Sequence, residues 1–244
     1  MINIIRNYLH KSQCQTGIAL TEEGRPRTVV RTTFSREGAD ILRAEMEYLR
    51  WYARQVADET FLNDMQVHVR DCYGKCQFPY HEGETGDYYR PLHLNAGKIA
   101  AVVRHYGKIF ADDEAPVHGD FSLGNIIFKG DDVSWIIDWE NANRCMPRCY
   151  DLIYLITENC LFCRLTGTRI ADEDTAAYRR LYREISDKYE IPAQVADGPG
   201  QWCSDVVRRY MEKTGIDHSK CPFIAVEGKI IREVDEILKR NGLP

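Results

Sequence analysis

The chain has 244 residues, of which 44% are hydrophobic and 28% are charged, so it can bury the core of one large domain or of two smaller lobes. Its formal net charge of -5 argues against nucleic acid as the main partner, because a phosphate backbone requires a basic surface. No apolar run reaches about 18 residues, so we expect no membrane-spanning helix. The first ten residues do not resemble a signal peptide.

Nine cysteines indicate free thiols in a reducing cytoplasm, because the number is odd and the chain is not a small secreted scaffold. The alternative is a structural zinc site, for which closely spaced cysteine pairs are the usual ligands. Only Cys160 and Cys163 have the typical CxxC spacing, and the surrounding residues 154–165 have the pattern of a buried helix. We therefore expect inert thiols in a cytoplasmic protein.

The first part of the chain is rich in predicted strands. Alternating or β-branched residues indicate strands at three places: residues 15–20, 28–34 and 66–69. A helix is expected from Ser35 or Arg36 to about Val56, because apolar residues recur there at helical spacing. Residues 71–91 are rich in Gly, Pro, Tyr and charge, and we expect them to form irregular connections.

The rest of the chain is predicted to be mainly helical. A helix over 94–110 precedes two short apolar strands, 125–128 and 134–138, that form a hairpin. Four more helices are then predicted: 151–165, 172–189, 200–213 and 225–241. This order predicts an α+β protein with a small β-rich N-terminal lobe, residues 1–90, and a larger helical C-terminal lobe, residues 91–244.

One segment carries residues that phosphoryl transfer requires: His118-Gly-Asp-Phe-Ser-Leu-Gly-Asn125. The transferred group is already activated, so the protein has to position it, hold a metal ion and orient the attacking hydroxyl. Asp120 follows a tight His-Gly turn, and we expect its carboxylate to accept the hydroxyl proton. Asn125 begins one strand of the predicted hairpin and Asp138 ends the other. If the strands pair, both side chains can serve as oxygen ligands of Mg²⁺.

These residues resemble the aminoglycoside phosphotransferase and choline kinase family, which is related to the protein kinases. That family carries the pattern His-Gly-Asp-x-x-x-x-Asn, followed by a strand that ends in Ile-Asp-Trp-Glu or a similar sequence. The matching positions are His118, Gly119, Asp120, Asn125, Ile137, Asp138, Trp139 and Glu140, followed by Pro147 and Tyr150-Asp-Leu152. The resemblance implies a two-lobed protein-kinase-like fold, ATP as the phosphoryl donor and Mg²⁺ as the metal.

In the resembling family, the N-terminal lobe holds the nucleotide through a strand cation paired with a helix glutamate. Arg31 occupies the place of the cation here, and Glu45 lies on the helix that follows. An Arg31–Glu45 pair would steady the guanidinium against the α- and β-phosphates. The glycine-rich phosphate loop is weak, because residues 11–17 contain a single glycine. Lys11, or the backbone near Gly17, is the alternative phosphate contact.

Several residues allow both a structural and a functional interpretation. We expect His118 to hold the loop by hydrogen bonds rather than to react. Asp151 fits the start of a helix, while the resemblance implies that it buttresses the catalytic loop. Glu140 could contact a second metal or the acceptor, or it could cap the next segment. The Tyr and Trp residues of 150–210 fit a helical core, with an aromatic cage for a quaternary ammonium as the alternative.

The sequence thus predicts a phosphotransferase that moves the γ-phosphoryl group of ATP, or of GTP, to a hydroxyl of a small molecule. The acceptor is open among aminoglycosides, choline, ethanolamine, sugars and related alcohols. A cationic acceptor would require carboxylates, and the candidates are Glu140, Glu158, Asp172, Glu173 and Asp174. The alternative is a catalytically inactive kinase-like protein that binds nucleotide or regulates a partner, which the short first lobe and the weak glycine loop favour.

Overall fold

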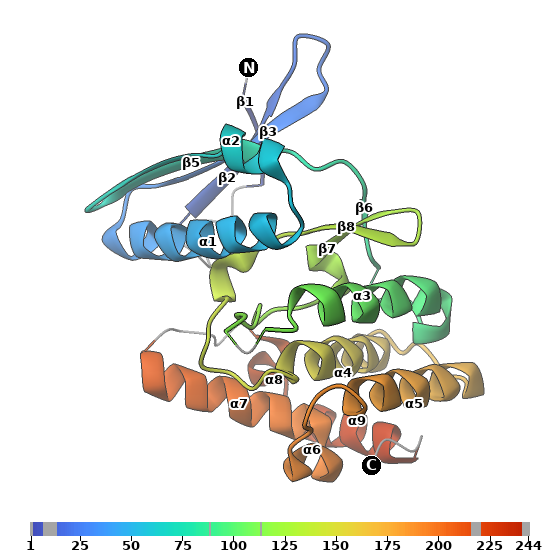
Figure 1. Cartoon of the computed structure of the whole chain (residues 1–244). Coiled ribbons are helices and arrows are strands. Elements are labelled where there is room, and N and C mark those ends of the chain that lie inside the picture. The colour runs from blue at the N-terminus through green and yellow to red at the C-terminus, as the bar shows by residue number, and fades with distance from the viewer. Residues whose placement is uncertain (1, 7–13, 88, 113, 216–220, 241–244) are drawn as a thin grey trace. The chain divides into compact units, whose positions relative to one another are not determined.

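The computed structural model describes residues 2–6, 14–87, 89–112, 114–215 and 221–240 (Figure 1). The chain divides into two compact units. The first unit is Met1–Glu82 with Asp138–Ala142, and the second is Gly83–Ile137 with Asn143–Pro244. The first is built on a β-sheet and the second is mainly helical, so the predicted α+β class is confirmed. The predicted lobe boundary after residue 90 stays a prediction.

The first unit contains a five-stranded antiparallel sheet in the order β1-β2-β3-β5-β4. The strands are β1 (Ile2–Arg6), β2 (Cys14–Leu20), β3 (Pro26–Thr33), β4 (Gln66–Arg70) and β5 (Tyr73–Pro79). The strands predicted from alternation and β-branching correspond to β2, β3 and β4. On the central strand β3, Arg31 is paired with Thr16 of β2 on one side and with Cys76 of β5 on the other. Backbone pairing on both sides therefore fixes the position of Arg31.

Helix α1 (Arg36–Gln55) confirms the helix predicted from Ser35 or Arg36 to about Val56. It packs against this sheet (Figure 1). The hydroxyl of Ser35 caps it by accepting a hydrogen bond from the backbone nitrogen of Gly38 at 3.0 Å. The helix buries one apolar face, made by Ala39, Leu42, Met46, Leu49, Tyr52 and Ala53. Glu45 lies on the same face and is 1% exposed. A carboxylate buried at this position requires a partner. The short helix α2 (Glu59–Asp64) follows and was not predicted.

The prediction that residues 71–91 form irregular connections is wrong for β5 and for the short strand β6 (Glu84–Thr85). Strand β5 lies between β3 and β4 and pairs with both. Its Gly and Pro content hides the strand pattern, and long-range pairing places it in the sheet. A Cβ atom at Gly74 would lie 2.9 Å from a methyl carbon of Leu42 on α1, so a larger residue would force that side chain to move. The glycine lets the helix approach the sheet.

The second unit has a small antiparallel sheet in the order β6-β7-β8. Its strands are β6 (Glu84–Thr85), β7 (Ile126–Lys129) and β8 (Asp132–Ile136). The predicted hairpin is confirmed, and Gly130 in its turn has a φ of 63°, a value that favours glycine. The prediction that the second strand runs to residue 138 is wrong, because β8 ends at Ile136.

Helices make up the rest of the second unit. They are α3 (Ala96–Ile109), α4 (Tyr150–Leu165), α5 (Asp172–Ser186), α6 (Ala193–Asp197), α7 (Pro199–Thr214), α8 (Pro222–Ala225) and α9 (Gly228–Arg240), with the 3₁₀ helices η1 (Leu92–Asn95) and η2 (Leu123–Asn125). The predicted helices are confirmed with small shifts of their ends, while α6 and α8 were not predicted. In the described segments, no helix has both the length and the hydrophobicity needed to cross a bilayer.

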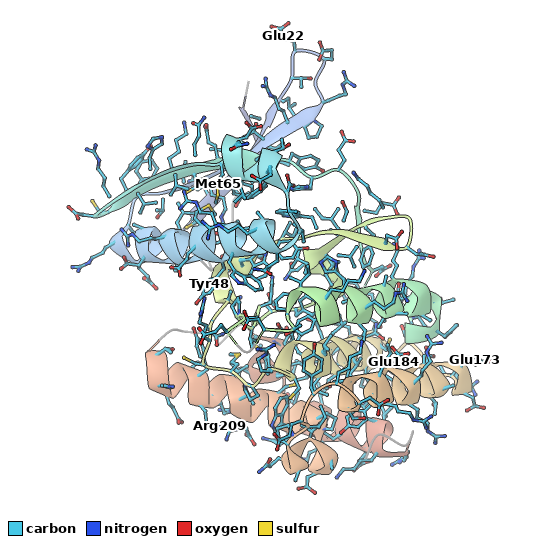
Figure 2. All side chains as sticks on the ribbon, viewed as in Figure 1. Glu22, Tyr48, Met65, Glu173, Glu184 and Arg209 are labelled. Carbon is cyan, nitrogen blue, oxygen red and sulfur yellow. The ribbon has the colours of Figure 1, made fainter. Side chains whose placement is uncertain are left out.

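Helix α4 is the central helix of the second unit. It packs against α5, α7 and α9 (Figure 1). Its residues from Tyr150 to Leu161 are all buried, and most of them are apolar. By contrast, α5 is amphipathic, and Glu173 lies exposed in its first turn (Figure 2). Because α4 is buried along most of its length, its polar residues lie inside the protein, where each needs a specific partner.

Candidate active-site residues

The loop that carries Asp120 is held by hydrogen bonds within the second unit. Val117 forms an isolated antiparallel bridge with Asn143. Gly119 follows with a φ of 83°, a backbone conformation that favours glycine. The carboxylate of Asp151, on α4, accepts hydrogen bonds from the backbone nitrogens of His118 at 2.7 Å and Gly119 at 2.9 Å. This geometry matches the buttressing role that the family resemblance implied for Asp151.

The ring of His118 also supports the loop, as we expected. Its Nε2 lies 2.9 Å from the carbonyl oxygen of Ile137, and its Nδ1 accepts a weaker hydrogen bond from the backbone nitrogen of Asp120 at 3.4 Å. The two contacts are compatible with a neutral ring that carries its proton on Nε2. The side chain is fully buried. Its two contacts link the loop to Ile137, the residue that follows β8.

Asp120 and Asn125 are joined by the side chain of Asn125. The amide nitrogen of Asn125 donates to the backbone oxygen of Asp120 at 2.8 Å and lies 3.4 Å from its carboxylate oxygen Oδ2. The other carboxylate oxygen, Oδ1, accepts a hydrogen bond from the hydroxyl of Tyr154 at 2.8 Å. The side-chain nitrogen of Asn125 thus faces Asp120, so its carbonyl oxygen is the end that can bind a metal.

Asp138 is linked to this loop along the chain. The backbone nitrogen of Ile137 donates to the carbonyl oxygen of Asn125 at 2.9 Å, and Asp138 is the next residue. Asp138 itself belongs to the first unit and precedes the 3₁₀ helix η3 (Trp139–Asn141). Its φ of 65° and ψ of 56° place it in the left-handed region, which Asp tolerates better than most residues.

Trp139 anchors the segment that contains Asp138. Its side chain is fully buried, and its ring centroid lies 5.2 Å from that of Tyr52 and 6.0 Å from that of Trp51, both on α1. Such aromatic contacts hold a short segment in place. The sequence interpretation of Trp139 as a packing residue in the resembling motif is therefore consistent with its surroundings.

The predicted contact between Arg31 and Glu45 is present in the first unit. Nη1 of Arg31 lies 2.5 Å from Oε1 of Glu45. Sequence reasoning did not find the other two partners of Arg31: its Nη2 donates to Oε2 of Glu140 at 3.1 Å, and its Nη1 lies 3.7 Å from Oδ1 of Asp138. Glu140, for which a cap was one interpretation, is thus an ion-pair partner 109 positions away. No local pattern in the sequence contains that information.

This cluster holds three carboxylates against one guanidinium. Burial alone lowers the pKa of Arg31, but Glu45, Asp138 and Glu140 together raise it, so the guanidinium stays charged. Burial raises the pKa of Glu45 to about 8, Arg31 opposes this, and the acids Asp138 and Glu140 add to it. The raised pKa of Arg31 favours a charged guanidinium, whereas the raised pKa of Glu45 favours a neutral carboxylic acid. Because Oε1 of Glu45 lies 2.5 Å from a permanently charged partner, we assign the pair as an ion pair. The cluster as a whole has an excess of negative charge that a bound cation would relieve.

Each of the two predicted magnesium ligands carries an oxygen atom of the kind that Mg²⁺ prefers. Asn125, in the second unit, offers an amide oxygen, and Asp138, in the first, offers a carboxylate whose side chain is 40% exposed. Their joint binding of the ion stays a prediction. Within the described ranges, no three or more His, Cys, Asp and Glu side chains form a cluster able to bind a metal.

A second polar group lies on the other side of Asp120. The hydroxyl of Tyr154, which contacts Asp120, is also 3.1 Å from Oε1 of Glu158. Both residues are on α4 with Asp151, at spacings of three and seven positions that put all three on one side of the helix. This spacing of polar residues in an otherwise apolar helix was a signal that the sequence analysis did not use.

Part of the chain matches a known family. Residues 79–187 match the model of the phosphotransferase enzyme family. This phosphotransferase-family segment contains Asp120, Asn125 and Asp138, but it does not include Arg31 or Glu45. The predicted resemblance is therefore confirmed for residues 79–187. No curated protein sequence matches the chain.

The phosphotransferase-family segment lies in a chain with a kinase fold. The structure is similar to that of amicoumacin kinase hAmiN in complex with AMP-PNP, Ca²⁺ and Ami, with 9% sequence identity, a TM-score of 0.52, and coverage of 97% of this chain and 88% of that one. Aminoglycoside phosphotransferase APH(2'')-Ib in its ADP-bound form is also similar, with 12% identity, a TM-score of 0.40, and coverage of 99% and 94%. The first similarity confirms the predicted protein-kinase-like fold.

Other predicted candidates are spread over the second unit. Asp172 and Glu173 are exposed at the start of α5, whereas Asp174 is buried and accepts hydrogen bonds from His93. The aromatic residues suggested for a cage are mostly buried in the helical core: Tyr150, Tyr154, Tyr178, Trp202 and Tyr210. Cys163 is buried in α4, and burial raises the pKa of its thiol to about 11.

The predicted phosphate loop is only partly described. Lys11 lies outside the described residues, so its suggested contact with phosphate stays a prediction. Gly17 lies within β2 and is paired with Val30 of β3. Its backbone is thus part of the sheet ladder.

Proposed function

We propose that the chain is an ATP-dependent phosphotransferase that transfers the γ-phosphoryl group to a hydroxyl of a small molecule. One observation carries the proposal: Asp120 lies on a loop tied to Asp151, faces Asn125, and through Asn125 and Ile137 is connected to Asp138. A base and two oxygen ligands held in this order are what phosphoryl transfer needs. The family match of residues 79–187 and the kinase fold support it.

In this proposal, each residue has a defined task. Asp120 orients the acceptor hydroxyl and takes its proton as the oxygen–phosphorus bond forms. Asn125 and Asp138 would hold Mg²⁺, which neutralises charge on the phosphate oxygens when bound. Arg31, steadied by Glu45, would bind the α- and β-phosphates of the nucleotide. Asp151 and His118 keep the loop in shape.

The test is a phosphorylation screen with ATP and with GTP, in the presence of Mg²⁺, over aminoglycosides, choline, ethanolamine, sugars and homoserine. We expect at least one acceptor class to be phosphorylated by the wild-type chain and not by Asp120→Asn. Phosphorylation that persists in this variant would refute the assigned mechanism.

The second candidate function is a kinase-like protein that binds nucleotide without turnover. It is favoured by the contact between Arg31 Nη2 and Glu140, because a carboxylate there occupies a donor that a phosphate would need. Thermal stabilisation by ATP with Mg²⁺, together with an absence of phosphorylation over the whole acceptor screen, would support this alternative. A ligand at about 100 times its Kd stabilises the folded state by about 2.7 kcal/mol.

A further inference from the structure

Three side chains of the second unit form a line that ends at Asp120. The hydroxyl oxygen of Tyr154 lies 2.8 Å from Oδ1 of Asp120 and 3.1 Å from Oε1 of Glu158. Both distances are those of hydrogen bonds. Asp120 is on the loop before β7, while Tyr154 and Glu158 are one turn apart on α4. The proposed mechanism uses only Asp120 of these three residues.

The number of protons in this line is limited. A tyrosine hydroxyl carries one proton and can donate only one hydrogen bond. An ionised carboxylate is an acceptor only, so two ionised carboxylates would compete for that proton. One of the two short oxygen–oxygen contacts would then be repulsive. The conflict disappears when one carboxyl group is protonated, because that group can donate to the oxygen of Tyr154.

The surroundings show which carboxyl group carries the proton. Glu158 is 4% exposed, and its Oε2 is buried with no hydrogen-bond partner. An ionised carboxylate in this state would be very costly. Asp120 is only half-buried and is faced by the amide nitrogen of Asn125. Burial raises the pKa of Glu158 well above 4.5, and the charge of Asp120 raises it further.

Among the described residues, the titratable groups that interact with Glu158 from neighbouring elements carry no positive charge. Besides Asp120 and Tyr154, the titratable groups that interact with it are the thiols of Cys203 on α7 and Cys221 before α8. Burial raises the pKa of Cys221 to about 12 and that of Cys203 well above its usual range, so both thiols are neutral. In the part of the chain that the structure describes, Oε2 of Glu158 therefore stays without a compensating cation.

We propose that Glu158 is a positioning residue of the phosphoryl-transfer reaction. Its carboxyl group keeps a proton and donates it as a hydrogen bond to Tyr154, which turns the hydroxyl proton of Tyr154 toward Oδ1 of Asp120. Asp120 is thereby held in place, with Oδ2 left to receive the proton of the acceptor hydroxyl. Tyr154 and Glu158 keep their own protons throughout. This inference rests on the proposed function.

A protonated Glu158 makes kcat for phosphoryl transfer depend on pH. When Glu158 ionises at high pH, the proton of Tyr154 is shared between two carboxylates and a second negative charge lies next to the base. The wild-type kcat should therefore fall at alkaline pH. Glu158→Gln keeps a donor toward Tyr154 but has no titrating group, so it should stay within about threefold of the wild-type kcat at neutral pH and lose the alkaline decrease.

The kinetic test uses the full chain with an acceptor found in the screen. Glu158→Leu should lower kcat by about tenfold to a hundredfold, because the base is no longer held in place, and should leave the KM for ATP nearly unchanged. Tyr154→Phe should have a similar effect, and the double variant should be little worse than either single variant. Glu184→Gln, on the outer part of α5, is the matched control and should behave like the wild type. A Glu158→Gln enzyme as impaired as Glu158→Leu, or with the alkaline decrease unchanged, would overturn the proposal.

A second measurement does not depend on turnover. The infrared difference spectrum between the wild type and Glu158→Gln at neutral pH should contain the carbonyl band of a protonated carboxylic acid. If this band is absent and a carboxylate band is found instead, Glu158 is ionised and the proposal is wrong. If the band is present but no acceptor is phosphorylated, the proposed function fails, and the positioning role fails with it.

Discussion

Arg31 and Glu45 form a buried ion pair, with Nη1 of Arg31 2.5 Å from Oε1 of Glu45. The side chains are 9% and 2% exposed. One residue is on the central strand β3 and the other on the apolar face of α1. Such a pair is costly to break from one side, by about 3–5 kcal/mol, because the remaining charge is left buried.

The first prediction concerns this pair. Arg31→Ala should raise the KM for ATP and lower kcat, with the KM for the acceptor nearly unchanged, because Arg31 is proposed to bind phosphate oxygens. Glu45→Ala should have a similar, milder effect, and the double variant should be little worse than Arg31→Ala. Arg31→Lys should be partly active, since lysine keeps the charge but not the planar fork. Steady-state kinetics and thermal unfolding of the four variants provide the measurement. Fully additive losses would show that the two residues act separately.

Asp120 is the proposed base. Asp120→Asn should keep the fold and nucleotide binding, because Asn preserves the size and can still accept the hydrogen bond from Tyr154. Its kcat should fall by about 10²–10⁴-fold, the usual contribution of general base catalysis. Nucleotide binding is measured by thermal shift and turnover by product formation. Wild-type turnover in Asp120→Asn would remove Asp120 from the mechanism.

The two proposed magnesium ligands, Asp138 and Asn125, are tested by substitution. Asp138→Asn removes the anionic ligand, and Asn tolerates the left-handed backbone found at residue 138. We expect this variant to need far more Mg²⁺ for turnover, and Asn125→Ala to change in the same direction but less. A magnesium titration of activity at saturating ATP measures the effect. An unchanged magnesium dependence in Asp138→Asn would mean that the metal is held elsewhere.

Asp151 is expected to contribute to both stability and activity. Asp151→Ala leaves the backbone nitrogens of His118 and Gly119 without their acceptor, together with the hydroxyl of Tyr106 at 3.0 Å. Each unsatisfied buried group costs about 1–3 kcal/mol, so the free energy of unfolding should fall by several kcal/mol. Urea denaturation measures this loss. A variant that is as stable as the wild type and fully active would contradict the buttressing role.

The raised pKa of Glu158 also predicts how stability depends on pH. The folded chain keeps the proton of Glu158, while the unfolded chain releases it near pH 4.5, the ordinary value. The stabilisation from this group is therefore complete below that pH and declines as the pH rises toward the folded-state pKa, by at most about 1.4 kcal/mol per pH unit. Glu158→Gln should remove this decline. Urea unfolding over a pH series measures the free energy of unfolding of the wild type, of Glu158→Gln and of the control Glu184→Gln. If Glu158 were ionised in the folded state, the curves of the wild type and of Glu158→Gln would be parallel.

Local pattern was sufficient for much of the fold and for part of the site. Periodic apolar residues predicted α1 and the long helices, and β-branching predicted β2 and β3, since these elements are stabilised largely by one buried face. The spacing of His118, Asp120 and Asn125 predicted a single loop, because those residues are close along the chain. The same pattern led to the family that residues 79–187 match.

The tertiary structure alone decided the remaining features. The strand β5 gains its place from pairing with β3 and β4, and Arg31 meets Glu140 across 109 positions. Glu158 is linked to Asp120 through Tyr154, because hydrogen bonds from the loop to Asp151 hold α4 against it. In each case the deciding interactions join residues far apart in sequence, and burial removes the water that would otherwise satisfy them. A sequence pattern records the polarity and period of a segment, but the partner of a buried charge depends on which segments pack together.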